Sequence, residues 1–323
     1  MEEQEHQPTV DQEKSEGLLY HYTDQKGLLG ILESKSIWAT HLRYLNDLSE
    51  GEIVSRAVWQ EINSRVNSDD LMQFIGIPPI EGMGKIECND EEIISQGHGM
   101  STWVTTQSVF VTSFSEKGNL LSQWRAYSGA SGGYSIGFSQ SYLRALGKHF
   151  LQDRPGRFYS DSNVLIRCRY FDDAEGKCLA EDLEDLVTSY INEATTAKQS
   201  QSIGSIKGFN NPGAIALKHF LQLGIRSAIT KDYAFHEESE FRFVFVLNRD
   251  NTQTDLEFRT GLSSLTPYFK IPLVWDSQPI EVKKIIIGPC PYPNEAIESV
   301  KMLLKKENIG GVEVASSKIP YRN

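Results

Sequence analysis

The apolar runs of this sequence are short, and their length limits the folds that the chain can adopt. Residues 241–247 (FRFVFVL) are typical of the longest runs and have the length of one β-strand. A membrane-spanning helix needs roughly 20 apolar residues in succession. We therefore expect no transmembrane segment and a fold that contains several short strands.

Strand-like and helix-like segments alternate irregularly along the chain. Apolar or aromatic runs predict strands at residues 18–22, 37–40, 109–114, 134–138, 164–170, 241–247, 266–271, 284–287 and 311–315. Apolar residues at helical spacing predict a helix after Thr23 or Asp24, and further helices at residues 50–66, 119–127, 181–197, 214–229 and 294–307. Asn294 is the expected N-cap of the last helix, and Gly310 is expected near its C-cap.

This pattern favours an α+β fold. The helices are too few, and the strands too irregularly spaced, for a doubly wound parallel sheet. No GxGxxG motif follows a strand, and residues 129–133 (GASGG) lack the Lys-Ser/Thr ending of a P-loop. Residues 1–16 are polar and acidic, which predicts a disordered tail. Residues 17–323 contain no linker or repeat, so we expect a single α+β domain there.

Composition and charge narrow the class of function. With 39% hydrophobic and 23% charged residues, the chain has the composition of a soluble globular protein. The net charge of −11 argues against a general polyanion binder, although a local basic pocket for one nucleotide remains compatible with it. The N-terminus lacks the basic start and apolar run of a signal peptide, which predicts a cytoplasmic protein. The four cysteines are dispersed without a CxxC motif, and we expect buried thiols.

Two polar motifs lie on predicted strands. His21 stands between Tyr20 and Tyr22 near a strand end, where it can bind a ribose hydroxyl or serve in acid–base chemistry. The alternative is a packed structural histidine. Alternation places Ser113 and Ser115 on one side of their strand, where they can bind the edge of a ligand or remain ordinary surface hydroxyls.

A third motif, residues 122–127 (SQWRAY), precedes the glycine loop. Trp124 and Tyr127 can stack on a planar ring, and Arg125 can bind phosphate. The alternative is a helix in which Trp124 anchors the core.

The acidic motif at residues 236–242 (HEESEFR) is the strongest candidate for chemistry. Glu238, Glu240 and Arg242 alternate with Phe241 and Phe243 and so share one face of the strand. Neighbouring carboxylates raise one another's pKa, and Arg242 lowers it. Such clusters occur at active sites but also in structural ion-pair networks. No motif has the spacing of a metal site, so no metal is expected.

Several motifs together are similar to a bacterial domain-of-unknown-function family, number twenty-nine seventy-one. The resemblance spans roughly residues 18–322 and rests on the motifs LYHYT, IWATHLRYLND, FVTSFSE, LSQWRAYS, GGYSIGF, EESEFRFVF and SSKIPYR.

The order of the motifs also resembles the ADP-ribosyltransferase superfamily. Members carry a His or Arg on the first strand, a Ser or Tyr on a middle strand and a Glu on a late strand. The resemblance implies an α+β fold with a split mixed β-sheet core and helical insertions. It implies cleavage of the nicotinamide–ribose bond of NAD, with NAD as substrate.

The resemblance also assigns catalytic roles. His21 would hold a ribose hydroxyl of NAD. Ser113 and Ser115 match the Ser-x-Ser strand that braces the site. Glu240 matches the catalytic glutamate, which would stabilise the oxocarbenium-like transition state. Glu238 matches the residue that contacts the acceptor.

The remaining expected contacts concern NAD binding. Thr23, or the backbone beside it, would hold the nicotinamide amide. Three aromatic residues are candidates for stacking on nicotinamide, namely Tyr22, Trp124 and Tyr127. Three cations are candidates for the diphosphate by motif position, namely Arg43, Arg125 and Arg242.

Three functions follow as hypotheses. The leading one is an ADP-ribosyltransferase that modifies RNA or a protein. By analogy with related folds this would be a toxin or phage-defence effector, with an antitoxin as a further expected partner. The second is an NAD glycohydrolase, in which water replaces the acceptor. The third is a non-enzymatic nucleotide- or protein-binding module built on Trp124, Arg125 and Glu240.

Overall fold

The structure is a computed structural model of the 323-residue chain. It describes residues 17–45, 109–128, 132–159, 164–171, 177–201, 212–247, 256–261 and 264–320, together with seven positions between 54 and 65. The expected tail at residues 1–16 and residues 129–131 of the glycine loop lie outside the described residues. None of the helices in the described ranges is long and apolar enough to span a membrane.

The strands are short, as the apolar runs predict. Their bounds are β1 Leu18–Asp24, β2 Ser36–His41, β3 Val109–Ser115, β4 Gly133–Ser139, β5 Phe158–Tyr159, β6 Leu165–Arg167, β7 Arg169–Phe171, β8 Thr230–Asp232, β9 Glu240–Leu247, β10 Glu257–Thr260, β11 Leu265–Pro272, β12 Lys284–Ile287 and β13 Glu313–Ser316.

The helices lie between these strands. Their bounds are α1 Gln25–Ser34, α5 Leu121–Tyr127, α6 Gln140–Gln152, α7 Lys177–Gln201, α8 Pro212–Ile229 and α9 Pro293–Lys306, with 3₁₀ turns η1 Leu42–Tyr44 and η2 Tyr233–Glu238.

Most of the strands join one mixed, largely antiparallel sheet. Its main path runs β10-β11-β2-β3-β1-β4-β12-β13, and β9 pairs with β3 outside that path. The pairing of β12 with β13 is parallel, whereas β1, β2, β3, β4 and β9 pair antiparallel. The protein is therefore an α+β protein, and the expected fold class is confirmed at this level.

The sheet forks at β3. One edge of β3 pairs with β9 along its whole length. The other edge is shared, because β2 pairs with Phe110 and Val111 while β1 meets only Ser115. The strands β1 and β2 therefore diverge next to the middle of β3.

The two faces of the sheet are packed differently. The main core cluster contains alternate residues of β9, such as Phe243 and Phe245, together with apolar residues of α1 and α6. The opposite face of β3 and β9 carries Val111 and Val244, which pack with the C-terminal part of α8. Because β9 is covered on both faces, all eight of its residues are buried.

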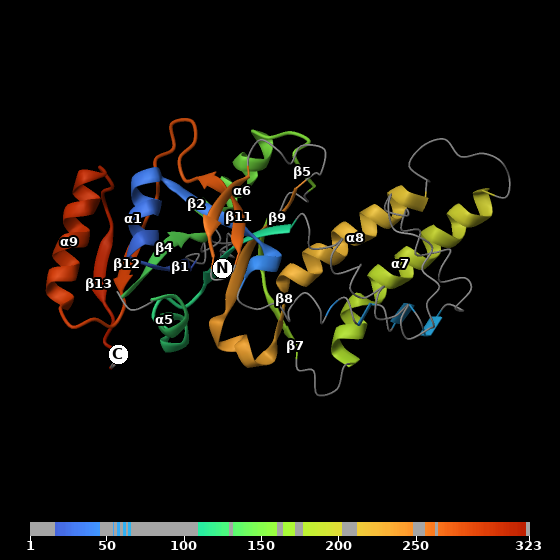
Figure 1. Ribbon diagram of the computed structural model, residues 1–323, viewed down its shortest axis with the longest axis horizontal. Coiled ribbons are helices and arrows are strands. Elements are labelled where there is room, and N and C mark those ends of the chain that lie inside the picture. The colour runs from blue at the N-terminus through green and yellow to red at the C-terminus, as the bar shows by residue number, and fades with distance from the viewer. Residues whose placement is uncertain are drawn as a thin grey trace, which may run out of the picture.

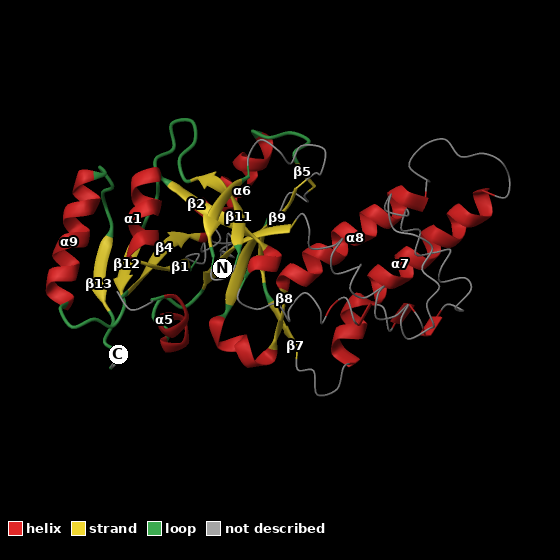
Figure 2. Ribbon diagram, in the orientation of Figure 1, coloured by secondary structure: helices red, strands yellow, loops and turns green. Residues whose placement is uncertain are grey.

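A pair of long helices extends away from the sheet. Figures 1 and 2 show α7 and α8 side by side, on the opposite side of the molecule from α9. Apolar side chains of α7 and α8 form a separate core cluster, to which Val54, Val58 and Ile62 from an earlier segment of the chain also belong. These three residues were predicted to line one face of a helix at 50–66, and all three are buried.

Local sequence explains how α1 begins. The Asp24 side chain accepts a hydrogen bond from the Gly27 amide at 2.7 Å and is the helix N-cap. A Cβ at Gly27 would lie 1.7 Å from Oγ1 of Thr23, so only glycine lets the helix start this close to β1. The prediction that Thr23 or Asp24 caps this helix is confirmed for Asp24.

Three local predictions are wrong. The run at 164–170 was expected to be one strand, but it divides at Cys168 into β6 and β7, which belong to different sheets. The N-cap position of α9 is Tyr292, because Pro293 opens the helix where Asn294 was expected to cap it. The left-handed residue after α9 is Asn308 (φ 57°), ahead of Gly310.

One helix and three short strands were not predicted at all, namely α6, β5, β8 and β10. The signal for α6 was present, since Tyr142, Leu143, Leu146 and Phe150 lie at helical spacing and are buried. The three short strands carry no such periodicity. The cysteines partly follow expectation: Cys168 is buried, while Cys290 is partly exposed. A single domain over residues 17–323 stays a prediction.

Candidate functional site

The polar residues of β3 and β9 meet across the sheet. Ser113 is directly opposite Arg242, and Ser115 is directly opposite Glu240. Directly paired residues of antiparallel strands point to the same face. These four candidate residues therefore share one face of the sheet, next to the start of β9, which η2 precedes along the chain.

Two carboxylates and two cations form a buried cluster at this point, which we call the charge cluster: Lys231, Glu238, Glu240 and Arg242. Lys231 Nζ lies 2.6 Å from Glu238 Oε2 and 2.7 Å from Glu240 Oε2. Arg242 Nε donates to Glu240 Oε1 at 2.7 Å, and Nη2 donates to Oε2 at 3.1 Å. The formal charges cancel within the cluster.

The end of α8 holds the cationic part of the cluster. Arg242 Nη1 donates to the Ala228 carbonyl at 2.7 Å, in the last turn of α8. A cation at a helix C-terminus is stabilised by unpaired carbonyls and by the helix dipole. Lys231 follows two residues after α8, on β8. The position of the C-terminal end of α8 thus determines where both cations lie.

A tight turn brings the two glutamates together. Ser239 has a left-handed backbone (φ 45°), and its carbonyl accepts from the Glu116 amide at 3.1 Å. Ser115 Oγ donates to the Glu238 carbonyl at 2.5 Å. A non-glycine residue held at positive φ is a strained position that the surroundings must stabilise. Ser115 thus braces the backbone of the turn.

The cluster sets the ionisation of the two glutamates differently. Burial tends to raise the pKa of Glu240, but the charges and hydrogen bonds of Arg242 and Lys231 outweigh it and lower the pKa to about 2. Burial raises the pKa of Glu238, against the opposing effect of Lys231. Glu238 is also the more accessible, since its side chain is 17% exposed against 6% for Glu240. Glu240 is a fixed anion, and Glu238 is the carboxyl that can gain a proton.

His21 lies in the fork between β1 and β2. Its Nδ1 is 2.9 Å from the Ser113 carbonyl, and its ring lies 5.9 Å from the Phe114 ring. A carbonyl can only accept, so Nδ1 carries the proton and Nε2 of the neutral ring is an acceptor. Burial lowers the pKa of His21, which favours the neutral ring. Since Tyr20 is opposite Ser115, alternation places His21 on the other face from Glu240.

The three candidate aromatic residues are in different environments. Tyr22 and Trp124 are buried against each other in an edge contact at 4.8 Å, and the Tyr22 hydroxyl is engaged by the backbone of residues 117 and 120. Tyr127 is 43% exposed. Desolvation of its phenol, reinforced by the charges of Glu240 and Glu238, raises the pKa of Tyr127 to about 12. Of these three candidates, Tyr127 is therefore the one whose hydroxyl is influenced by the charges of the cluster.

The remaining candidates, apart from Arg242, make no hydrogen bond to the charge cluster within the described residues. Thr23 packs its hydroxyl over Gly27 at the start of α1. Arg125 is exposed on α5, and Arg43 is exposed on η1. Arg242 is the one candidate arginine whose side chain contacts Glu240 in the described structure.

Two contributors escaped the sequence interpretation. Lys231 is on β8, which was not predicted, and no local pattern marks it. Tyr170 accepts a hydrogen bond from the Glu240 amide at 2.7 Å through its hydroxyl, which positions the start of β9. Lys231 is 7 and 9 residues from its two glutamates, whereas Tyr170 is 70 residues from Glu240. The parallel pairing of β7 with β8 sets Tyr170 beside Lys231.

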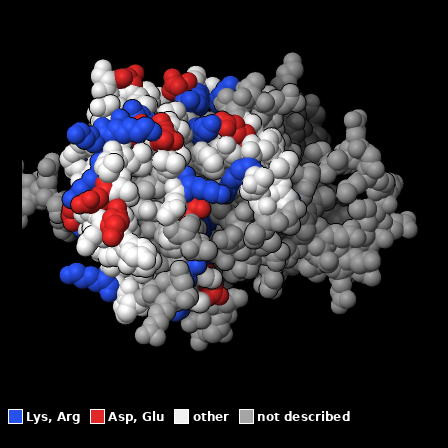
Figure 3. Space-filling view, turned by 60° about the vertical axis from the view of Figure 1, so that its left-hand side comes forward, with Lys and Arg blue, Asp and Glu red and all other residues white. Residues whose placement is uncertain are grey.

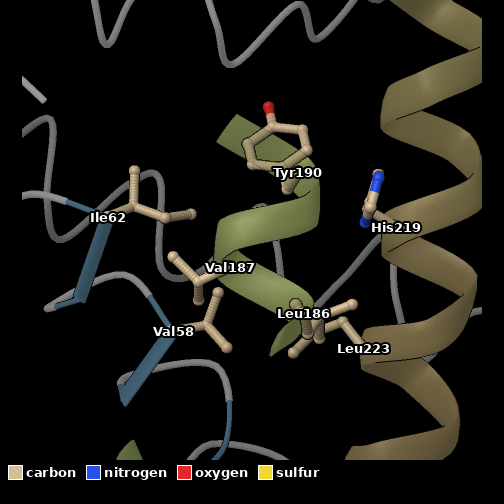
Figure 4. A pocket seen from close by; sticks show the side chains of 7 residues that line it. All are labelled: Val58, Ile62, Leu186, Val187, Tyr190, His219 and Leu223. Atoms are coloured by element: carbon tan, nitrogen blue, oxygen red, sulfur yellow. The ribbon is translucent and has the colours of Figure 1, made fainter. Parts of the chain in front are cut away.

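Two cavities lie away from the charge cluster. One of about 30 Å³ lies between α7 and α8, where His219 and Tyr190 face apolar side chains such as Val187 (Figure 4). The other, of about 280 Å³, borders Phe150 and Lys270. Among the described residues, no group of three or more His, Cys, Asp or Glu side chains is arranged to hold a metal ion.

With this geometry in place, comparison with known proteins adds one result. Residues 123–243 match the family described as "Protein of unknown function (DUF2971)". This is the family that the motifs indicate, and the match covers the segment from α5 into β9. No curated protein and no solved structure is similar to the chain at a significant level.

Proposed function

We propose that this protein is an ADP-ribosyltransferase that cleaves the nicotinamide–ribose bond of NAD and transfers ADP-ribose to a macromolecule. The observation that carries the proposal is the arrangement of three adjacent strands. Tyr20, next to His21 on β1, is opposite Ser115 on β3, which is opposite Glu240 on β9. The motif order of the sequence thus becomes a spatial order at the fork of a split sheet.

Glu240 has the ionisation that this chemistry needs. Loss of nicotinamide leaves the electron pair on its ring nitrogen and positive charge on the ribose, which a preorganised anion stabilises. With its pKa lowered to about 2, Glu240 is ionised throughout the physiological range. Among the described residues, its Oε1 accepts one hydrogen bond, from Arg242 Nε, and a carboxylate oxygen has two acceptor sites. A ribose hydroxyl can take the second site.

Glu238 suits the acceptor side of the reaction. The acceptor nucleophile must lose a proton as its bond to the ribose carbon forms, and a carboxylate with a raised pKa is a better base than an ordinary one. Glu238 has the raised pKa and the greater exposure of the two glutamates. It is two residues from the proposed catalytic glutamate.

Tyr127 is the residue that we assign to nicotinamide stacking. Stacking requires an open ring face, and Tyr22 and Trp124 are buried against each other. Because Arg242 is committed to Glu240 and Ala228, we assign the diphosphate to the exposed Arg125 and Arg43. His21 is on the other face of the sheet from Glu240, so we do not assign it to the ribose that Glu240 would hold.

The test is nicotinamide release from NAD, measured by chromatography in the presence of total RNA and protein. Glu240→Gln should reduce release by at least about a hundredfold, the scale of losing one electrostatic contact to a transition state. Glu313→Gln, an exposed glutamate on β13, is the matched control and should keep full activity. Circular dichroism checks that each variant is folded.

Because Glu240 is buried, its variant could fail to fold. Tyr127→Ala changes an exposed residue and should reduce nicotinamide release while the fold is kept. Unchanged release in both folded variants would contradict the proposal, and so would an inactive wild-type protein. ADP-ribose freed in solution without transfer would assign the protein to the NAD glycohydrolases instead.

A further inference from the structure

An exposed tryptophan is stacked at the surface of the sheet beside the candidate site. The ring of Trp38 on β2 lies 4.3 Å from the ring of Tyr268 on β11, with 28° between their planes. Trp38 is 39% exposed, whereas Tyr268 is buried. The tyrosine backs the indole, so the exposed ring is held by a neighbour beneath it.

Strand register places Trp38 next to the charge cluster. Thr40 is opposite Val111, so Trp38, two residues before it, is on the same face as Ser113 and Arg242. The Trp38 carbonyl accepts from the Thr112 hydroxyl at 2.9 Å, which ties β2 to β3 at this level. In strand order, β3 lies between the strand that carries Trp38 and the strand that carries Arg242.

A cation accompanies the stacked rings. The Arg259 guanidinium carbon lies 5.8 Å from the centre of the Trp38 ring, and Nη2 is 3.4 Å from the Thr40 hydroxyl. Lys270 is opposite Trp38 but is paired with Glu257 at 2.8 Å. Within the described residues Arg259 has no such acidic partner, so it is the cation available to an incoming anion.

We propose that Trp38, Tyr268 and Arg259 form a stacking surface for a base of a single-stranded RNA, the acceptor of the proposed transfer. Every base presents a π-face, and stacking on an aromatic ring combined with an arginine is the usual mode for single strands. The role of this RNA as the acceptor rests on the proposed function. The stacking surface itself is argued from the contacts of Trp38, Tyr268 and Arg259.

The charge distribution favours a local contact over a broad one. The net charge is −11, and Figure 3 shows positive and negative side chains interspersed over one face of the molecule. A polyanion is therefore not held by a general positive field. Affinity has to come from stacking on the Trp38 surface, with few phosphate contacts and a shallow dependence on salt.

The experiment is fluorescence anisotropy of a short labelled oligouridylate, without NAD, over a salt series. Trp38→Ala should weaken binding roughly 5- to 150-fold, which corresponds to losing one base–aromatic stack, and Trp38→Phe should restore most of it. Arg259→Gln should lower the salt slope by about 0.7, the value for one phosphate contact with a single strand. Tyr292→Ala, an exposed aromatic residue at the start of α9, is the control.

The outcomes separate this inference from the proposed function. Absence of RNA binding by the wild-type protein, or equal binding by Trp38→Ala, would overturn the stacking surface even if NAD is cleaved. Binding that depends on Trp38 in a protein that does not cleave NAD would keep the surface and remove the proposed function. Binding of an unstructured protein substrate at the same residues, with no RNA binding, would overturn the choice of RNA.

Discussion

Ionisable side chains are buried both in the charge cluster at the start of β9 and beside the cavity between α7 and α8. The two regions differ in whether these side chains have hydrogen-bond partners. In the cluster, both oxygens of the Glu240 carboxylate accept from nitrogens of Lys231 and Arg242. In the helical pair, His219 is 6% exposed, and neither ring nitrogen has a hydrogen-bond partner within the described residues. Its Nε2 approaches Glu193 only at 3.5 Å.

The difference follows from how each region is assembled. Strand register fixes Arg242 and Glu240 on one face of β9, and the end of α8 delivers Lys231 and a carbonyl to the same point. Side chains between two helices are placed by apolar packing, which leaves an imidazole in an apolar cavity. Buried charge is stabilising when its partners are in place and costly when one is removed. The four predictions below test this contrast in order of decreasing effect.

The largest effect is expected from removing one partner of the cluster. Arg242→Met should lower the free energy of unfolding by about 3–5 kcal/mol, because Glu240 loses its bidentate partner and stays buried. Urea unfolding followed by circular dichroism measures it. The double variant Arg242→Met with Glu240→Gln should lose less than the single variant. A loss below about 1 kcal/mol in Arg242→Met would show that the cluster contributes little.

Acid should destabilise the protein in two separate pH windows. The pKa of Glu240 is lowered from the ordinary 4.5 to about 2, so its contribution is complete above pH 4.5 and is lost as pH falls toward 2. The free energy of unfolding, measured by urea unfolding from pH 5 to 2, should fall by an amount on the order of 3 kcal/mol, and this fall should be absent in Glu240→Gln.

The histidine window lies higher. Burial lowers the pKa of His219 below 6.5, as it does for His21, so the unfolded chain takes up protons that the folded chain does not. Stability is complete above pH 6.5 and declines below it by at most about 1.4 kcal/mol per pH unit for each histidine. The free energy of unfolding measured from pH 7 to 5 should decline less steeply in His219→Leu. An unchanged slope would contradict the buried neutral state of His219.

A smaller effect of opposite sign is expected in the helical pair. His219→Leu should raise the free energy of unfolding by about 1 kcal/mol, because a buried polar group without hydrogen bonds is replaced by an apolar one of similar size. Thermal and urea unfolding measure it, with His219→Ala as the control that enlarges the cavity and destabilises. Destabilisation by leucine would mean that the contact with Glu193 stabilises the helical pair.

The smallest effect is expected from an exposed ion pair. Lys284 on β12 and Glu313 on β13 are 2.7 Å apart, but the glutamate side chain is 63% exposed. Solvent screens such pairs, so Glu313→Gln should change the free energy of unfolding by less than about 0.5 kcal/mol. A change as large as that of Arg242→Met would show that burial is not what separates the two pairs.

Local signals in the sequence were enough to identify most of the elements and the faces of the strands. Alternation in residues 240–246 separates Glu240 and Arg242 from the phenylalanines, and Asp24 caps α1 as its type and position indicate. These features depend on residues close together along the chain, and their periods of 2 and 3.6 are set by backbone geometry. The break at Cys168 was missed because two neighbouring segments join different sheets.

The site itself depends on contacts that no local pattern encodes. Lys231 reaches both glutamates because α8 ends beside β9, and Tyr127, rather than Tyr22 or Trp124, is the exposed candidate whose hydroxyl is influenced by their charges. Trp38 shares a face of the sheet with Ser113 only because β2 pairs with β3. Tertiary structure decided these points, since strand order and helix placement depend on the packing of the whole core, whereas alternation and capping depend on neighbouring residues alone.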